Sequence, residues 1–376
     1  MALLSHLDVM PIRVRAFYTR YPHWGAHSGF HQLCRHLDPA LVSVSGRAIS
    51  DSDEDWPIPS NPLNWGLRRY VTRGMRWYKL SDLTAEIAAV PAALTHAVDI
   101  IHFLDAEHTG QYLPRWIKRW PHSRVKTIGT FHQPPELLPG LVDPKIVASL
   151  DRVVVVSPSQ LPYFRALLPA ERVQTILHGI DVEFFRPAES RKTDGIFRCI
   201  TVGHWMRDWG AIRAVAEAVR PRPHLEFHTV TNRATGLEDL PNVHRHENVD
   251  DESLRGLYQQ ADVLFLPLEN ATANNSLLEG IACGLPVVST RIEPVLAYVD
   301  ETMADLVAGN EPEALAAAIC RLHDDPARRA RMGAAARARA EALAWSRLAV
   351  EWQDLYASML EKKGDDVPGG TPGSTA

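Results

Sequence analysis

Cysteine is scarce in this sequence, with four copies among 376 residues, and those four lie far apart. Because none forms a C-x-x-C pair, the spacing excludes the common zinc sites and disulfide frameworks and favours a reducing compartment. Long apolar runs are also missing, and none approaches the roughly 20 residues that a membrane-spanning helix needs. The start of the sequence lacks the basic segment, apolar stretch and cleavage site of a secretory signal. We therefore expect a cytoplasmic protein.

Neither sign of charge dominates. The net charge of −5 leaves no basic surplus of the kind that nucleic-acid-binding proteins carry, so we expect no nucleic-acid partner. What is present is the composition of a folded globular protein, with 45% apolar and 23% charged residues. A chain of this length exceeds one ordinary core and predicts two domains.

Apolar, β-branched runs alternate with helical patterns, which is typical of parallel sheets covered by helices on both faces. The predicted strands form two series, first Ile12–Tyr18, Ile100–Phe103, Lys126–Phe131, Arg152–Val156 and Val173–Leu177, then Phe197–Val202, Leu225–Val230, Asp262–Leu266 and Pro286–Ser289. Two series predict an α/β fold of two Rossmann-like domains, residues 1–186 and 187–345, facing across a cleft. We expect Asp51–Asn64 to be a surface loop and Asp305–Leu360 to be helical. A terminal helix over 346–363 is expected to pack back across the joint, before a disordered tail, 364–376.

The segment Asp262–Pro286 combines a strand, a loop and a helix predicted over Asn275–Ala282. A helix N-terminus at the carboxyl edge of a parallel strand offers unpaired N–H groups and a favourable dipole to an anion such as a diphosphate. The polar residues at this N-terminus suit helix capping or phosphate binding, and Glu279 one turn later suits a ribose diol; the candidates for donor binding here are Asn274, Asn275, Ser276, Leu277 and Glu279. A plain capped helix with an exposed Glu279 is the alternative.

The stretch ENATANNSLLEGIACGLPVVST resembles the donor-binding motif of glycosyltransferase family 4, in which two glutamates eight positions apart precede a helix and G-x-P-V-V. Four further segments resemble the family in the expected order: DRVVVVSPSQ, VQTILHGIDVEFFRP, ITVGHWMRDWG and LRGLYQQADVLFLP. The resemblance implies the GT-B fold and a donor bound mainly by the C-terminal domain. It also implies sugar transfer from a nucleoside diphosphate sugar, UDP being favoured, usually with retention and without metal.

The sequence departs from the family at two places. The first glutamate aligns with Ala271, and Glu269 is our candidate to replace it as a catalytic or sugar-binding carboxylate. The family's phosphate-binding Arg and Lys align with His204 and Trp209, so His204 and Arg207 are the candidate phosphate ligands here. A solvated surface position is the alternative for Arg207.

On the N-terminal side, WGAHSGF (Trp24–Phe30) resembles the glycine-containing loop that the family brings close to phosphate and acceptor. Gly29 is our candidate for donor contact, and His27 and Ser28 for the acceptor side; a strand-to-helix turn is the alternative. His132 follows the predicted strand Lys126–Phe131 and matches the family position whose histidine faces the sugar, so it is our candidate catalytic residue. A structural histidine is the alternative. Asp105 is a further candidate for acceptor binding, chosen without a spacing rule.

Two stretches interleave basic and aromatic residues, at 65–80 and 113–126. Such segments suit a membrane surface, where Trp inserts at the interface and Arg or Lys meets lipid phosphate, so a lipid-linked acceptor is possible on this pattern. Solvated helices are the alternative.

Rival functions fit the sequence less well. Asp51-Ser52-Asp53 has the letters of a metal-binding GT-A motif but lies in an acidic, Pro-rich loop, and no G-x-G-x-x-G supports a dehydrogenase. A nucleotide-sugar 2-epimerase on the same fold, and a non-catalytic protein that keeps sugar-nucleotide binding, both remain open. We expect a metal-independent glycosyltransferase with no cofactor.

Overall fold

The computed structural model describes residues 10–21, 25–58, 62–190 and 194–361. The predicted tail at 364–376, Trp24 of the glycine-containing loop and Lys192 near the predicted joint lie outside these ranges. Among the described residues, no helix is long and apolar enough to cross a membrane.

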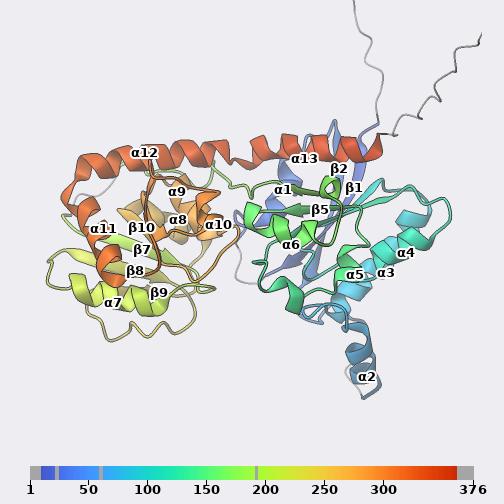
Figure 1. The fold of residues 1–376 in the computed structure, drawn as a ribbon, viewed down its shortest axis with the longest axis horizontal. Coiled ribbons are helices and arrows are strands. Elements are labelled where there is room, and N and C mark those ends of the chain that lie inside the picture. The colour runs from blue at the N-terminus through green and yellow to red at the C-terminus, as the bar shows by residue number, and fades with distance from the viewer. Residues whose placement is uncertain (1–9, 22–24, 59–61, 191–193, 362–376) are drawn as a thin grey trace, which may run out of the picture.

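Two six-stranded parallel sheets form the framework (Figure 1). In spatial order the first sheet contains β2 (Val42–Ser50), β1 (Ile12–Arg20), β3 (Ile100–Phe103), β4 (Lys126–Phe131), β5 (Arg152–Val155) and β6 (Val173–Thr175). The second contains β12 (Ala304–Val307), β11 (Val287–Thr290), β10 (Val263–Leu266), β7 (Phe197–Val202), β8 (Leu225–Val230) and β9 (Val243–His246). The predicted α/β class with two Rossmann-like units is confirmed. The boundary at residues 186 and 187 stays a prediction; we call the parts around the two sheets the N-terminal and C-terminal domains.

Helices cover both faces of each sheet. In the N-terminal domain they are α1 (Leu33–His36), α2 (Pro62–Val71), α3 (Leu80–Leu94), α4 (Leu113–Arg119), α5 (Pro144–Val147) and α6 (Leu161–Arg165). In the C-terminal domain they are α7 (Trp209–Val219), α8 (Asp251–Gln260), α9 (Asn275–Ala282), α10 (Glu293–Leu296), α11 (Pro312–Asp324) and α12 (Pro326–Ala342). The final described helix, α13 (Trp345–Leu360), follows α12 directly.

Neighbouring strand residues point to opposite faces, and this alternation divides each domain into two cores. In the first sheet, Val14 and Ile100 pack into one core, whereas Phe17 and Ile101 pack into the other. Strands buried on both faces need apolar side chains at nearly every position. This is why the central strands were visible in the sequence as continuous apolar runs.

Two structural expectations were wrong. Asp305–Leu360 is not helical throughout, because Ala304–Val307 forms β12. This short strand pairs with β11 at the edge of the second sheet. The predicted loop Asp51–Asn64 ends early, because α2 begins at Pro62, where a proline suits the first turn of a helix.

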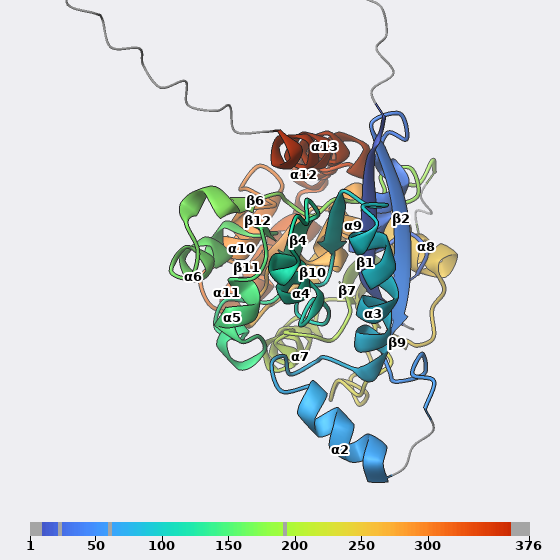
Figure 2. The same ribbon diagram turned by 90° about the vertical axis from the view of Figure 1, so that its right-hand side faces the viewer.

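Helix α13 lies on the N-terminal domain although it ends the C-terminal helix series (Figures 1 and 2). Its apolar face joins the core above β1 and β3, with contributions from Trp345, Ala349, Trp352, Leu355, Tyr356 and Met359. The hydroxyl of Tyr356 lies 2.8 Å from Nδ1 of the buried His102 on β3. The chain therefore crosses between the domains twice.

The carboxyl ends of both sheets meet across the cleft. The Tyr298 hydroxyl donates to the Val156 carbonyl after β5 at 2.6 Å and accepts from the His178 amide at 3.0 Å. Thr272 donates its hydroxyl to the carbonyl of His132, and Asn270 donates its amide to Glu136 at 3.0 Å. These contacts set the loops after β4 and β10 against each other.

Candidate active site between the domains

The N-terminus of α9 faces the cleft and is capped by its own sequence. The side chain of Asn274 accepts a hydrogen bond from the Leu277 amide at 3.1 Å. The Ser276 hydroxyl donates to the Val202 carbonyl at the end of β7, at 2.9 Å. The helix start is thereby fixed to the carboxyl ends of β7 and β10, where an anion meets the helix dipole. Asn275, between them, is half-buried.

Arg207 lies directly behind this helix start. Its guanidinium donates to the Val202 carbonyl at 2.6 Å and to the Ser276 hydroxyl at 3.0 Å. The alternative of a solvated surface position for Arg207 is wrong, because the residue is 9% exposed; its role as a phosphate ligand remains a prediction. Burial lowers the pKa of Arg207 to about 10, while Tyr258 and Glu279 act in the opposite direction. The group stays charged at neutral pH and reinforces the positive end of α9.

Glu279 is buried, which contradicts the plain exposed position considered above. One carboxylate oxygen accepts from the Ser28 hydroxyl at 2.6 Å, and the other accepts from the Tyr258 hydroxyl at 2.8 Å. Burial raises the pKa of Glu279, and the two hydroxyl donors oppose that rise. Two hydroxyls on one carboxylate are the arrangement that a ribose diol would supply.

The described part of the glycine-containing loop bridges the domains. The Ala26 amide donates to Asp251 at the start of α8 at 2.6 Å. A Cβ at Gly25 would lie 1.5 Å from an oxygen of the same carboxylate, so a side chain here would require Asp251 to move. Gly29 has a φ of 93°, which L side chains rarely adopt, and it directs the chain into the turn that precedes α1. The loop contacts α8 and α9 of the C-terminal domain.

His27 and Ser28 therefore face the C-terminal domain and the joint. His27 Nδ1 lies 2.7 Å from a carboxylate oxygen of Asp181, and its ring stacks on Phe184 with centroids 3.7 Å apart. Asp181 follows the last strand of the first sheet. The loop is thus held at the hinge by His27 and at α9 by Ser28. Their expected role on the acceptor side remains a prediction.

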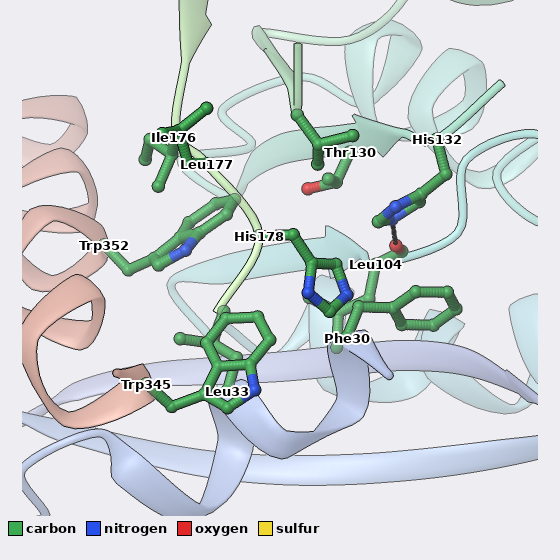
Figure 3. Close-up of a pocket in the computed structure, with 11 residues that line it drawn as sticks. Phe30, Leu33, Leu104, Thr130, His132, Ile176, Leu177, His178, Trp345 and Trp352 are labelled. Carbon is green, nitrogen blue, oxygen red and sulfur yellow. Dashed lines mark hydrogen bonds between the residues drawn. The ribbon is translucent and has the colours of Figure 1, made fainter. Parts of the chain in front are cut away.

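His132 is packed among apolar and aromatic groups at the end of β4 (Figure 3). Its Nε2 lies 2.7 Å from the Leu104 carbonyl, and because a carbonyl only accepts, Nε2 carries the proton of this bond. The ring lies against Phe30, with centroids 4.5 Å apart. Burial lowers the pKa of His132 and Asp105 opposes that change, so the imidazole is neutral at pH 7.

A buried carboxylate pair follows β3. Asp105 accepts from the Tyr21 hydroxyl at 2.9 Å, and Glu107 accepts from the amides of His132 and Gln133 at 2.5 and 2.7 Å. Burial would raise the pKa of Asp105, but its contacts with His108 and the hydrogen bond from Tyr21 lower it below its usual value. Burial and the charge of Asp105 raise the pKa of Glu107 well above its usual value. The pair thus divides into an ionised Asp105 and a protonated Glu107 that holds the His132 loop.

The loop before α9 contains Glu269 and Ala271, and the expected role of Glu269 remains a prediction. Ala271 is buried in the core, whereas Glu269 is exposed and its amide is fixed to the Met206 carbonyl at 3.0 Å. His204 lies on the neighbouring loop with its ring stacked on Trp209. Its Nδ1 is buried without a hydrogen-bond partner among the described residues.

Sequence reasoning did not find three residues that complete this arrangement, namely Tyr258, Asp251 and Asp181. Tyr258 and Asp181 each touch a predicted site residue, and Asp251 touches Ala26 of the glycine-containing loop; all three contacts come from distant segments, so no local spacing identifies them. Tyr258 and Asp181 lie in segments that resemble the family, whereas Asp251 lies outside them.

Residues 201–325 match the family model described as glycosyl transferases group 1. This part of the chain is similar to the group 1 glycosyltransferases. It is 30% identical over 222 residues to the D-inositol 3-phosphate glycosyltransferase of Corynebacterium diphtheriae, covering 51% of this chain and 52% of that protein. A D-inositol 3-phosphate glycosyltransferase 2 of Catenulispora acidiphila is 26% identical, over 78% of this chain and 81% of that protein. The first relatives are thus matched over only about half their length.

Solved structures with the same architecture span nearly the whole chain. Sucrose-phosphate synthase from Thermosynechococcus elongatus superposes with a TM-score of 0.70 at 18% identity, covering 93% of this chain and 99% of that one. Anabaena HepE in complex with UDP superposes with a TM-score of 0.64 at 15% identity, covering 92% and 100%. At these identities the likeness establishes the GT-B fold.

Proposed function

We propose that the chain transfers a glycosyl group, with retention, from a nucleoside diphosphate sugar to a hydroxyl of an acceptor in saccharide or glycoconjugate synthesis. UDP is the favoured nucleotide, because a structural neighbour is described as a complex with UDP. The names of the sequence relatives make a polyhydroxylated ring such as an inositol phosphate one acceptor to test.

One observation carries the proposal: the buried carboxylate of Glu279 lies one turn inside a helix whose N-terminus faces the cleft. The diphosphate would lie at the amides of Asn275 and Ser276, with Arg207 behind them strengthening the local field. The ribose diol would take the places of the Ser28 and Tyr258 hydroxyls on Glu279. Preorganised donors at the departing diphosphate stabilise the charge that develops during transfer.

The N-terminal side would orient the sugar. His132 is neutral and its loop is held by Glu107, so it offers a polar group of fixed position without an added charge. We assign Glu269 no role in the reaction, because it is exposed while the expected carboxylate position holds Ala271. Contacts across the cleft exclude water, which limits hydrolysis of the donor.

Calorimetry with UDP tests the donor site. We expect UDP to bind and Glu279→Ala to weaken it by a free energy of about 1–3 kcal/mol, since a hydrogen-bonded carboxylate is lost. Asp239→Ala, at an exposed site in the same domain, serves as the control. Equal UDP affinity in the Glu279 variant would remove this residue from the donor site.

Turnover separates the proposal from its rivals. Incubation with UDP-glucose should release UDP slowly without acceptor, because transferases leak donor to water. Conversion of the sugar nucleotide into its 2-epimer, followed by NMR, would instead identify an epimerase. Binding without any product would identify a non-catalytic sugar-nucleotide-binding protein.

We further propose that α2 contacts a lipid surface bearing the acceptor. This helix projects from the body of the N-terminal domain, and Trp65 and Tyr70 are 69% and 66% exposed along it (Figures 1 and 2). Arg69 supplies positive charge beside them. The second basic–aromatic stretch, 113–126, fits this role less well, because Trp116 and Trp120 pack partly into the core.

Sedimentation with vesicles tests the membrane proposal. With phosphatidylcholine and phosphatidylserine at low salt, the wild type should co-sediment, and Trp65→Ser with Tyr70→Ser should not. Neutral vesicles provide the control for charge. Absence of wild-type binding to the anionic vesicles would reject the proposal.

A further inference from the structure

A pocket outside α9 is lined by residues from the segments that follow α2, β4 and β7. This pocket has a volume of about 330 Å³ and includes Trp77, Leu137 and Trp205 in its lining, together with Arg76 and Glu136. Its volume is at the lower end of the range of small-molecule sites, which begins at about 300 Å³. It lies between the domains, because Trp205 follows β7 whereas the other four precede the joint.

Backbone contacts hold the part of the pocket wall that the N-terminal domain contributes. The segment of Arg76 and Trp77 is held against the segment after β4 by a bridge between Met75 and Val142. The Arg76 amide also donates to the Leu141 carbonyl at 2.8 Å. The Trp77 ring lies 5.0 Å from His108, the neighbour of the Asp105 network. This wall therefore has a fixed shape and backs onto the polar residues at the end of β3.

The opposite wall exposes a large aromatic side chain on a fixed loop. Trp205 is 58% exposed, yet its carbonyl accepts from Arg207 at 2.8 Å and the next carbonyl, of Met206, accepts from the Glu269 amide. A fixed, exposed indole presents an apolar face at little cost in conformational entropy on binding. The indole of Trp77 also lines this pocket, together with the charged side chains of Arg76 and Glu136.

The location separates this pocket from the nucleotide site. The loop Glu269–Asn274 runs between the α9 N-terminus and the pocket, and its Asn270 amide binds Glu136 on the pocket rim. A donor with its nucleotide at Glu279 and its sugar at this loop would present the anomeric carbon toward the pocket. Glycosyl transfer requires the acceptor to bind on that side of the anomeric carbon, which is the side of the pocket.

We propose that this pocket is the subsite for a carbohydrate ring of the acceptor. Sugar rings combine an apolar CH face with a rim of hydroxyls, which matches indole faces flanked by Arg76 and Glu136. Trp205 and Trp77 stack on the ring, and the two charged side chains bind its hydroxyls. The inference rests on the proposed glycosyl transfer and adds the chemical class of the acceptor.

Saturation-transfer NMR on the full chain with UDP present tests the assignment. The probe is octyl β-D-glucopyranoside below its micelle concentration, with the methyl glucosides, galactosides and mannosides alongside. We expect the ring CH protons of at least one probe to receive saturation. Saturation confined to the octyl chain would overturn the carbohydrate assignment, as would no saturation of any probe.

Substitution at Trp205 tests the residue itself. Trp205→Ala should weaken probe binding about tenfold, the size expected when a stacking face and its buried area are lost, and Trp205→Phe should restore most of it. Val350→Ala is the control, because it removes apolar surface from an exposed position of α13. Unchanged probe binding in Trp205→Ala would overturn the proposal.

Measurements of UDP affinity distinguish a failure of the proposed glycosyl transfer from a failure of the pocket assignment. UDP should bind Trp205→Ala as tightly as it binds the wild type. A wild type that does not bind UDP contradicts the proposed function. A wild type that binds UDP but no glycoside contradicts this pocket assignment alone. A loss of UDP affinity in Trp205→Ala would assign the pocket to the nucleotide and overturn the acceptor proposal.

Discussion

At the scale of single residues, the Ser28 hydroxyl donates a hydrogen bond to one oxygen of Glu279. The two residues come from different domains, so the bond also holds the glycine-containing loop over α9. In the proposed donor site, a ribose hydroxyl would compete with Ser28 for this oxygen. On that proposal, the Ser28 side chain is an internal competitor for the nucleotide.

Removing that competitor should strengthen donor binding. We expect Ser28→Ala to bind UDP about three- to tenfold more tightly, because a hydrogen bond to a charged group contributes about 1.5–3 kcal/mol and part of it is regained elsewhere. Calorimetry at pH 7.5 measures the change. Ser149→Ala, at a buried serine outside the cleft, is the control. Weaker UDP binding in Ser28→Ala would show that the hydroxyl serves the ligand.

The protonation of Glu279 should appear in the pH dependence of UDP binding. Its folded-state pKa is raised by burial, so the carboxylate that accepts the diol is lost at a higher pH than for an ordinary glutamate. UDP affinity should therefore fall as the pH decreases through that raised pKa. The pH profile of UDP affinity for Glu279→Gln should lack this decrease and should show only the change caused by protonation of UDP. Parallel pH profiles for the two proteins would contradict the assignment.

Residue patterns predicted the helix of the site but not its partners. The cap at Asn274 and the helix bounds Asn275–Ala282 follow from local sequence, since capping and helical periodicity act over a few residues. The contact of Glu279 with Ser28 spans 251 positions, and the burial of Arg207 depends on the packing of α9 against β7. Such contacts are products of tertiary packing, which leaves no spacing rule in one sequence.

At the scale of elements, the docking of α13 depends on a buried histidine. His102 lies between the hydroxyls of Tyr356 and Thr130, each at 2.8 Å, and burial lowers its pKa to about 3. An unfolded histidine has a pKa of about 6.5. Between these values the unfolded chain binds a proton that the folded chain does not. The contribution of His102 to stability is thus present above pH 6.5 and is lost as the pH falls toward 3.

His102→Gln should flatten this part of the stability profile. Glutamine retains hydrogen-bonding groups but does not titrate, so the variant should lose less stability than the wild type between pH 7 and pH 4.5. The difference should be about 2 kcal/mol, as an upper value for a shift of this size. Urea unfolding at both pH values measures it. Equal losses in both proteins would show that the histidine is not neutral in the fold.

Element prediction succeeded where burial is strong on both sides. Strands β4, β7 and β8 lie where their apolar runs predicted them. The edge strand β2 was not predicted, because its sequence VSVSGRAIS is exposed at several positions and interrupted by glycine. β9 was missed for a related reason, since VHRH lacks apolar character. Edge strands are specified by their partner rather than by their own hydrophobicity.

At the scale of the whole molecule, Tyr298 joins the domains through one buried hydroxyl. Tyr298→Phe removes the bonds to Val156 and His178 and leaves two buried backbone groups unpaired, which should cost about 1–3 kcal/mol. We expect a lower unfolding temperature by calorimetry and faster hydrogen exchange at the His178 amide. Tyr163→Phe is the control, because the Tyr163 hydroxyl has no hydrogen-bond partner among the described residues. Identical exchange in the two variants would contradict a role for Tyr298 in holding the cleft.

The two crossings of the chain between its domains also order the events of its synthesis. The N-terminal domain lacks Trp345, Trp352 and Tyr356 until the ribosome has made α13, some 170 residues after β6 is complete. Until then, the apolar surface over β1 and β3 faces water or a chaperone. Folding from the first residue onward therefore stops short of the native state. The last described helix to emerge therefore completes the core of the N-terminal domain.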